Sequence, residues 1–352
     1  MSYQRDFERR IRIGLVGAGK HAYRNLLPAL HYLPVTLTAI CDLDLERAQS
    51  AAREYGVKGV YQKTSEMCAN EELDAVLLCV SPQAHPELAC EAFEAGLHVW
   101  MEKPPATRAY QVRAMIKKRR DRVCVVGFKK VFMPSARKVV EIMSDPKYGP
   151  VQNMLGIYPG GPVPADGEQT LRDQVPNDWL ANGVHPVSMM LGVGGPVAAV
   201  TMHRGRRSGS VCVLEFENGC IGTLHIATGA AASQPAERYL FVGRGCHVEI
   251  ENSLRVTFQR GIPYRYGVTT NYISEGFDHG AIVWEPQNHL STLENKSLFT
   301  QGIYGELKYF CDCVLEERKP ELGTLEFAYD VMRVYEASLL SDGQRVELAA
   351  IE

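Results

Sequence analysis

The sequence predicts an α/β protein with a doubly wound parallel sheet at its N-terminal end and a β-rich second domain. Residues 11–127 alternate short apolar runs with amphipathic helical stretches, as such a sheet requires. A glycine-rich turn follows the first apolar run, and from about residue 150 the segments become longer and β-branched, with turn signals between them. These three observations indicate two domains, which we place at residues 1–130 and 131–352.

The expected elements follow from the apolar pattern of each segment. In the first domain we expect strands over residues 11–16, 37–41, 75–80, 98–101 and 123–126, joined by helices over 21–31, 45–55, 86–95 and 110–118. After a helix over 135–143, we expect strands over 197–203, 210–217, 220–227, 239–242, 247–251 and 254–259. Residues 260–299 have weak periodicity and predict a long excursion that contributes to a substrate pocket or a subunit contact. Helices return over 305–317 and 325–338.

Composition argues against several classes of partner. The 38 basic and 41 acidic residues give a formal charge of −3, which offers no polycationic surface for nucleic acid or anionic lipid. No stretch reaches the roughly 20 apolar residues that a membrane span needs. The ten cysteines lack the spacing of a zinc site and are typical of reduced residues in a cytoplasmic protein. We therefore expect a cytoplasmic protein without a metal, whose partner is a small molecule.

The glycine-rich turn is Gly17-Ala18-Gly19-Lys20-His21-Ala22, between the first strand and the first helix. Gly17 permits a tight turn, Gly19 lets the backbone approach a pyrophosphate, and Ala22 lets the helix pack closely on the strand. The pyrophosphate of a dinucleotide would then lie on the helix N-terminus. This context predicts a dinucleotide-binding Rossmann domain.

Asp42 ends the next strand, 20 residues after Ala22. A carboxylate at that place accepts the ribose hydroxyls of NAD and would repel the 2′-phosphate of NADP. We therefore expect NAD rather than NADP, with Arg47 as the main argument for NADP.

The tripeptide Glu102-Lys103-Pro104 follows a short apolar strand, where a nicotinamide ring would be expected. Hydride transfer from an alcohol carbon also requires removal of the hydroxyl proton. A buried lysine beside the ring can hydrogen-bond the developing alkoxide and relay that proton. Lys103 is the expected acid/base, and Glu102 either orients it or bonds to the cofactor ribose.

Together these motifs resemble the glucose-fructose oxidoreductase/inositol dehydrogenase (Gfo/Idh/MocA) family. The resemblance rests on the glycine-rich turn, Asp42, and three further segments: Val80-Ser81-Pro82-Gln83-Ala84-His85, Gly96-Leu97-His98-Val99 and Glu102-Lys103-Pro104. It implies a second α/β domain with a large, open, mostly antiparallel sheet that commonly forms an oligomer interface, here a homodimer or homotetramer. It also implies a C-terminal helix that packs back on the first domain, and NAD(P)-dependent oxidation or reduction of a sugar or cyclitol carbon.

The resemblance also implies site residues. The cofactor would contact the residues Gly17, Ala18, Gly19, Lys20, His21, Asp42, Ser81, Pro82, His85, Glu102 and Lys103. The substrate would contact Lys103, Tyr158, Trp179, Asn182 and His185, with His185 as a second acid/base. Weaker candidates for a sugar site are Arg172, Asn177, Asp178, Arg238, Tyr264 and His279.

The chain departs from the family pattern at two places. The family often has Asp-x-Gly-x-His-x-x-Asp around the histidine, whereas this chain has Ala181 and Ser188 in place of the two acids. It has Lys129-Lys130-Val131 where the family often has Asn-Arg-Arg, which keeps positive charge but not bidentate geometry.

Three functions fit these residues. The first is an NAD(P)-dependent oxidoreductase acting on a hydroxyl carbon of a sugar, glycoside or cyclitol. The second is an NAD-dependent glycosidase-like lyase or hydrolase that works by transient oxidation and elimination. The third is a non-catalytic nucleotide-binding sensor, against which Lys103 argues.

Overall fold

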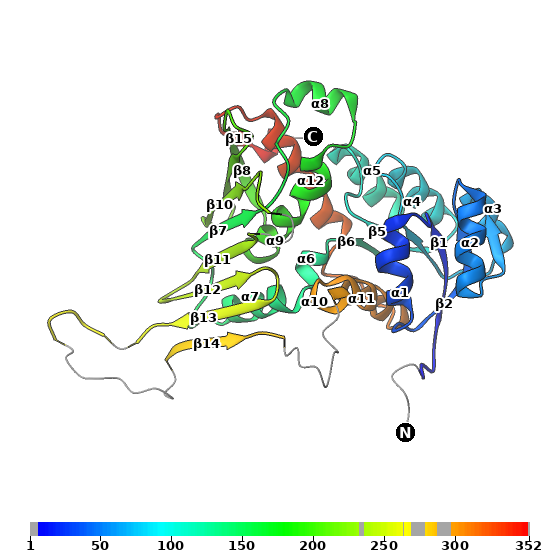
Figure 1. The fold of residues 1–352 in the computed structure, drawn as a ribbon, viewed down its shortest axis with the longest axis horizontal. Helices are drawn as coiled ribbons and strands as arrows, with labels where there is room; N and C mark the ends of the chain where they lie inside the picture. Colours follow the sequence, from blue (N-terminus) through cyan, green and yellow to red (C-terminus); the bar gives the residue numbers. More distant parts are fainter. Residues whose placement is uncertain (1–5, 232–235, 263, 269–278, 287–296, 351–352) are drawn as a thin grey trace.

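A computed structural model describes residues 6–231, 236–262, 264–268, 279–286 and 297–350 of the chain (Figure 1). Their strands form two sheets that lie at opposite ends of the molecule, with helices between them. We call them the parallel sheet, β1–β6, and the mixed sheet, β7–β15. Among the described residues, no helix is both long and apolar enough to cross a membrane.

The parallel sheet has the strand order β3-β2-β1-β4-β5-β6, and all its neighbouring strands run parallel. Its strands are β1 (Ile11–Val16), β2 (Val35–Cys41), β3 (Gly59–Tyr61), β4 (Ala75–Leu78), β5 (His98–Glu102) and β6 (Cys124–Gly127). The strand order reverses between β1 and β4, and in such sheets ligands bind outside the carboxyl ends of the strands at this point. The predicted doubly wound fold is confirmed.

The helices of this domain are η1 (Ala22–Leu26), α1 (Leu27–Leu30), α2 (Leu45–Tyr55), α3 (Thr64–Asn70), α4 (His85–Glu94), α5 (Ala109–Arg119) and α6 (Lys129–Phe132). The expected helix over 21–31 is divided into a π-helical turn and a short α-helix. The sequence did not predict β3 or α3, because three and seven residues are too short to establish a period.

The mixed sheet has the strand order β14-β13-β12-β11-β7-β10-β9-β8-β15, and β7 pairs in parallel with β10 while the other pairs are antiparallel. Its strands are β7 (Asn153–Tyr158), β8 (Val197–Arg204), β9 (Ser210–Phe216), β10 (Ile221–Ile226), β11 (Arg238–Val242), β12 (Cys246–Glu251), β13 (Arg255–Arg260), β14 (Gly280–Trp284) and β15 (Val346–Glu347). The central strand β7 was not predicted, because Gly156 interrupts its short apolar run.

The expectation of a long excursion over 260–299 was wrong at residues 280–284, where β14 adds an edge strand to β13. The pairing is long-range, and the alternately half-buried and exposed side chains of β14 give a weak sequence signal. The start of α10 (Ser297–Thr300) also falls in this range. Residues 263, 269–278 and 287–296, on which part of the expectation falls, lie outside the described residues.

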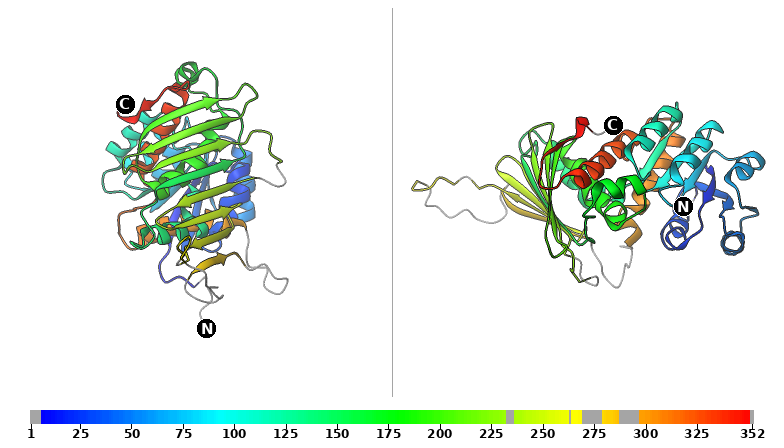
Figure 2. Two further views of the ribbon diagram at one scale, coloured as in Figure 1. Left: turned by 90° about the vertical axis from the view of Figure 1, so that its left-hand side faces the viewer. Right: turned by 90° about the horizontal axis from the view of Figure 1, so that it is seen from above.

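The remaining helices are α7 (Pro134–Ser144), α8 (Gly167–Asp173), η2 (Trp179–Gly183), α9 (Val184–Gly194), α11 (Ile303–Leu315), α12 (Leu325–Leu340) and η3 (Leu348–Ala350). The helices α7, α9 and α12 pack on one face of the mixed sheet. In the described part of the chain, no helix covers the other face, which is turned toward the viewer in the left panel of Figure 2. From the C-terminal part of the chain, α11 lies against β1, β5 and β6, and α12 lies against α5.

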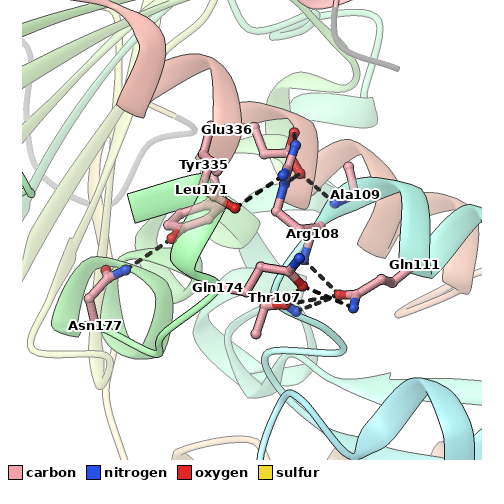
Figure 3. A network of polar contacts seen from close by, with 9 residues as sticks. All are labelled: Thr107, Arg108, Ala109, Gln111, Leu171, Gln174, Asn177, Tyr335 and Glu336. Carbon is pink, nitrogen blue, oxygen red and sulfur yellow. Dashed lines mark hydrogen bonds and ion pairs between the residues drawn. The ribbon is translucent and has the colours of Figure 1, made fainter. Parts of the chain in front are cut away.

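A polar network joins the two domains at the start of α5 (Figure 3). The guanidinium group of Arg108 donates to both carboxylate oxygens of Glu336 on α12, from Nε at 2.9 Å and from Nη2 at 3.3 Å. The amide of Ala109 also donates to this carboxylate, at 2.6 Å. Arg108 donates as well to the carbonyl oxygen of Leu171 on α8, at 3.1 Å. The Glu336 side chain is only 3% exposed, so the ion pair lies largely out of water.

We expect Glu336→Gln to lower the free energy of unfolding by about 3 kcal/mol, because it leaves Arg108 next to a neutral amide in a buried place. Chemical denaturation followed by circular dichroism measures this loss. The control is Glu326→Gln, which breaks the more exposed ion pair with Arg119 and should cost less than about 1 kcal/mol. Equal losses in the two variants would contradict the importance of the buried pair.

Candidate active site

The two glycines after β1, Gly17 and Gly19, have different structural roles. Gly17 has a φ of +90°, and a Cβ there would lie 2.2 Å from the carbonyl oxygen of Cys79, so another residue would strain the turn. A Cβ at Gly19 would meet no atom within 4 Å, so the backbone there borders open space. This space lies at the N-terminal end of η1, as the pyrophosphate of a dinucleotide needs. The turn therefore fits NAD.

Asp42 is fixed at the end of β2 and is buried. Its Oδ2 accepts from the amide of Ala18 at 2.8 Å, and its Oδ1 accepts from the amide of Asp44 at 2.9 Å. The guanidinium group of Arg47 lies 3.2 Å from Oδ1 of Asp42 and 3.0 Å from Asp44. Arg47 is thus held by two carboxylates, while Asp42 keeps acceptor capacity for a hydroxyl.

A second series of hydrogen bonds connects the carboxyl ends of β1 and β5. Nε2 of His21 lies 2.8 Å from Oε1 of Glu102, and Oε2 of Glu102 accepts from the amide of Lys103 at 3.1 Å. The other predicted cofactor residues, Lys20 and the pair Ser81-Pro82, lie in the turns that follow β1 and β4 at the same edge of the sheet. The structure thus brings most of the predicted cofactor residues together.

Lys103 connects this edge to the second domain. Its Nζ donates to the carbonyl oxygen of Ala181, at 3.2 Å, on the short helix η2. Burial lowers the pKa of the Lys103 ammonium group from its usual value, and the Glu102 carboxylate opposes this shift. A lysine with a lowered pKa exchanges protons more readily near neutral pH.

His185 lies in the first turn of α9, four residues after Ala181, so the two residues share one side of the helical segment. Its ring is buried, and Nδ1 has no hydrogen-bond partner among the described residues. Burial lowers the pKa of His185 well below its usual value, and the charges of Lys103, Lys129, Lys130 and His21 lower it further. The imidazole is therefore neutral at pH 7, and one of its nitrogens can accept a hydrogen bond.

A hollow of about 500 Å³ opens beside these groups, and Lys129, Lys130, Tyr158, Glu237, Ser253 and Gln301 are among its lining residues. Lys130 is buried and donates to Glu237 and, at 2.8 Å, to the hydroxyl of Ser253. Its Nζ also lies 5.9 Å from the centroid of the Tyr158 ring. The hollow is of a size that takes a small ligand.

Two of the predicted contact residues are buried in this structure. His85 is fully buried, and its Nδ1 lies 2.9 Å from the carbonyl oxygen of Pro104, next to Lys103. Trp179 is 2% exposed and donates from Nε1 to the hydroxyl of Ser338, so it is a core residue. Both sequence positions adjoin the site, but their side chains turn into the core.

Asn182 lines a second hollow of about 310 Å³ together with Asp178. Its amide donates to Oδ1 of Asp178 at 2.6 Å, while Oδ2 of Asp178 accepts from the amide of Gly161. Two weaker candidates lie elsewhere: Arg172 pairs with Glu168 on the exposed side of α8, and Asn177 donates to the hydroxyl of Tyr335.

The sequence reasoning missed Glu237 and Glu306. Glu237 pairs with Lys130 across 107 residues of sequence, so no local pattern indicates it. Glu306 is 1% exposed, and its Oε2 has no partner among the described residues. Burial raises the pKa of Glu306 well above its usual value, and the Glu102 charge raises it further. The sequence indicates the burial of Glu306 by its position beside the apolar residues Ile303 and Leu307 on one side of α11.

A larger hollow, of about 770 Å³, lies at the opposite edge of the parallel sheet and contains none of these groups. Arginines line it, but Arg122 pairs with Asp121, Arg119 with Glu326, and Arg318 with Glu316. Within the described ranges, no three His, Cys, Asp or Glu side chains converge as a metal site requires. The candidate active site is therefore the edge that contains Lys103.

The parallel sheet and its glycine-rich turn define an NAD-binding Rossmann domain. Residues 11–129 match the family model GFO_IDH_MocA, described as "Oxidoreductase family, NAD-binding Rossmann fold". Over these residues the chain matches the Gfo/Idh/MocA family, which confirms the predicted resemblance and the NAD-binding domain.

Individual relatives agree with this assignment over part of their length. The 4-carboxy-2-hydroxymuconate-6-semialdehyde dehydrogenase of Sphingobium sp. is 35% identical over 127 residues, which are 36% of this chain and 40% of that protein. The inositol 2-dehydrogenase of Corynebacterium glutamicum is 26% identical over 227 residues, 60% of this chain and 65% of that protein. Both matches thus span less than two thirds of the relative.

The fold extends over the whole length of a solved structure. A dehydrogenase from Chromobacterium violaceum has a TM-score of 0.79 and 22% identity, with 95% of this chain and 96% of that chain covered. At this identity the likeness shows the fold, including the large mixed sheet of the second domain.

We expect Gly17→Ala to destabilise the protein by about 1–3 kcal/mol, because alanine is strained at a φ of +90° and its Cβ would clash with Cys79. Gly19→Ala meets no atom in the protein, so its thermal unfolding should be unchanged while its Kd for NADH rises at least tenfold. Thermal melting and a fluorescence titration with NADH measure the two effects. Unchanged NADH binding by Gly19→Ala would contradict the assignment of this turn.

Proposed function

We propose that this chain is an NAD-dependent oxidoreductase that transfers a hydride between nicotinamide and a hydroxyl carbon of a sugar, glycoside or cyclitol. The observation that carries the proposal is the place of Lys103, which directly follows β5 at the nucleotide edge and reaches the second domain through its contact with Ala181. The names of the relatives, a carboxylated semialdehyde dehydrogenase and an inositol dehydrogenase, support a small carbonyl or hydroxyl compound as substrate.

The bound nicotinamide would supply the hydride acceptor or donor, and the chain's own residues would handle the proton. Lys103 would bond to the substrate hydroxyl through Nζ and take its proton as the carbonyl forms, or return it in the reverse direction. The neutral ring of His185, from the same side of the η2–α9 segment as Ala181, would accept or return a proton in concert with Lys103. His21 and Glu102 would hold the backbone of Lys103 in place.

We expect Lys103→Met to lower kcat by about 10²–10⁴-fold, because the proton transfer loses its acid/base. In the wild type, the rate of alcohol oxidation should rise with pH as Lys103 loses its proton, with a midpoint below 10.5 because burial lowers this pKa. His185 should add no midpoint near its usual value, because its ring stays neutral there. Absorbance at 340 nm measures NADH formation against a panel of sugars, glycosides and inositols.

The matched control for charge is Lys117→Met, on the exposed end of α5, which should leave the rates unchanged. Equal activity of Lys103→Met and the wild type would contradict the role of Lys103. Release of an aglycone without net NADH formation would instead indicate the glycosidase-like reaction, and absence of any turnover would favour a sensor.

The cofactor preference is proposed to follow from the pairing of Asp42 with Arg47. Asp42→Ala should raise the KM for NAD by about tenfold, because a ribose hydroxyl loses its acceptor. The same change frees Arg47 for a 2′-phosphate, so the KM for NADP should fall. Steady-state kinetics with both cofactors tests this, and a variant that still prefers NAD as strongly as the wild type would contradict it.

The described residues leave one face of the mixed sheet uncovered, with Ile221 and Val283 exposed by 50% and 43% on its strands. This supports the expectation of a homodimer or homotetramer through that sheet, which stays a prediction. The cytoplasmic location and the division at residue 130 also stay predictions.

A further inference from the structure

The hollow of about 500 Å³ has an excess of positive charge, because among the described residues Lys129 and Lys130 line it with the single carboxylate of Glu237. It adjoins the buried His185 through Tyr158, whose ring centroid lies 6.5 Å from that of His185. The charges of Lys129, Lys130 and Lys103 all act on this ring. A hollow lined by an excess of one charge favours ligands of the opposite charge.

Only one of these lysines has a carboxylate of its own. Lys130 pairs with Glu237, and Ser253 completes the pair with hydrogen bonds to both. In contrast, Lys129 donates to the neutral side-chain oxygen of Gln301 at 3.2 Å, and no carboxylate pairs with it among the described residues. The charge of Lys129 is therefore not neutralised by the described part of the chain.

The nearby acids do not supply the missing negative charge. Glu102 is bonded to His21 and to the amide of Lys103, and its charge acts on Lys103. Burial raises the pKa of Glu306 well above its usual value, which favours its uncharged form. Asp178 is bonded to Asn182 and to a backbone amide at the other hollow. Each carboxyl group thus has another partner or no charge.

The ammonium group of Lys103 donates to the backbone carbonyl oxygen of Ala181, and the alanine side chain has no charge. A carbonyl oxygen orients an ammonium group but does not balance its charge. Of the two cations, Lys103 and Lys129, only Lys103 thus has a carboxylate, Glu102, acting on it.

We propose that the substrate of this site carries a carboxylate close to its reacting hydroxyl, as uronic and aldonic acids do, and that Lys129 binds this carboxylate. The inference rests on the proposed oxidoreductase function. Lys103 then remains free to contact the hydroxyl, and the ligand supplies the negative charge that the site lacks. A lysine suits this role as a compact point charge with three donors.

The test compares matched pairs of compounds that differ in one carboxylate: D-glucuronate with D-glucose, D-galacturonate with D-galactose, and D-gluconate with D-glucitol. In a pair that reacts, kcat/KM for the acid should exceed that for the neutral compound at least tenfold. Lys129→Met should raise KM for the acid at least tenfold with kcat within threefold, and should leave the neutral compound unchanged. Lys129→Arg should retain most of the acid activity, and Lys117→Met should change neither.

Ala181→Asp provides the converse change, because it adds a negative charge beside Lys103. It should lower the preference for the acid over its neutral partner at least tenfold. A wild type that prefers the neutral compounds would overturn the inference. So would a Lys129→Met variant that weakens acids and neutral compounds equally, since that result indicates a structural role for Lys129.

A binding measurement separates this inference from the proposed function. Calorimetry of D-glucuronate, D-galacturonate and D-gluconate against the NADH-loaded protein and its Lys129→Met variant requires no turnover. Binding that depends on Lys129, without turnover of any compound, would support the anion site and contradict the oxidoreductase function. Turnover of neutral sugars alone would support the oxidoreductase function and contradict the anion site. The absence of both binding and turnover for every acid would also overturn the inference.

Discussion

The ion pair between Arg108 and Glu336 is the constraint on which the geometry of the candidate site depends. Arg108 lies five residues after Lys103, at the start of α5, and Glu336 lies on α12 between the two sheets. The carboxylate of Glu336 also accepts the amide of Ala109, where an anion is favoured by the helix dipole. One buried carboxylate thus fixes the segment after Lys103 to the helix that supports the mixed sheet.

The chemistry of the site follows from which charges have partners. Lys130 is neutralised by Glu237, and burial favours the uncharged form of Glu306 on α11. Lys103 and Lys129 keep their charges at the border between the domains, next to a neutral His185. The main electrostatic property of this site is that it has fewer carboxylates than lysines. It is consistent with the alanine at position 181.

Five strands of the parallel sheet could be predicted, because each is a short apolar run and the connections between them are local. For the same reason Asp42 and Lys103 could be placed at one edge of that sheet. The mixed sheet gave weaker signals: β7 pairs with β10 and β11, which lie far along the chain, and Gly156 lowers its strand propensity. The directions of His85 and Trp179 depend on core packing, which spacing alone does not reveal.

The position of α11 has a consequence for how the protein is made. This helix lies on β1, β5 and β6, and the amide of Val126 at the end of the parallel sheet donates to the carbonyl oxygen of Gly323, at 2.7 Å. Synthesis proceeds from the N-terminus, so the six strands leave the ribosome long before residues 303–340 exist. Part of the apolar surface of the first domain therefore stays uncovered until α11 has been synthesised. The parallel sheet is thus translated well before the helix that completes its packing.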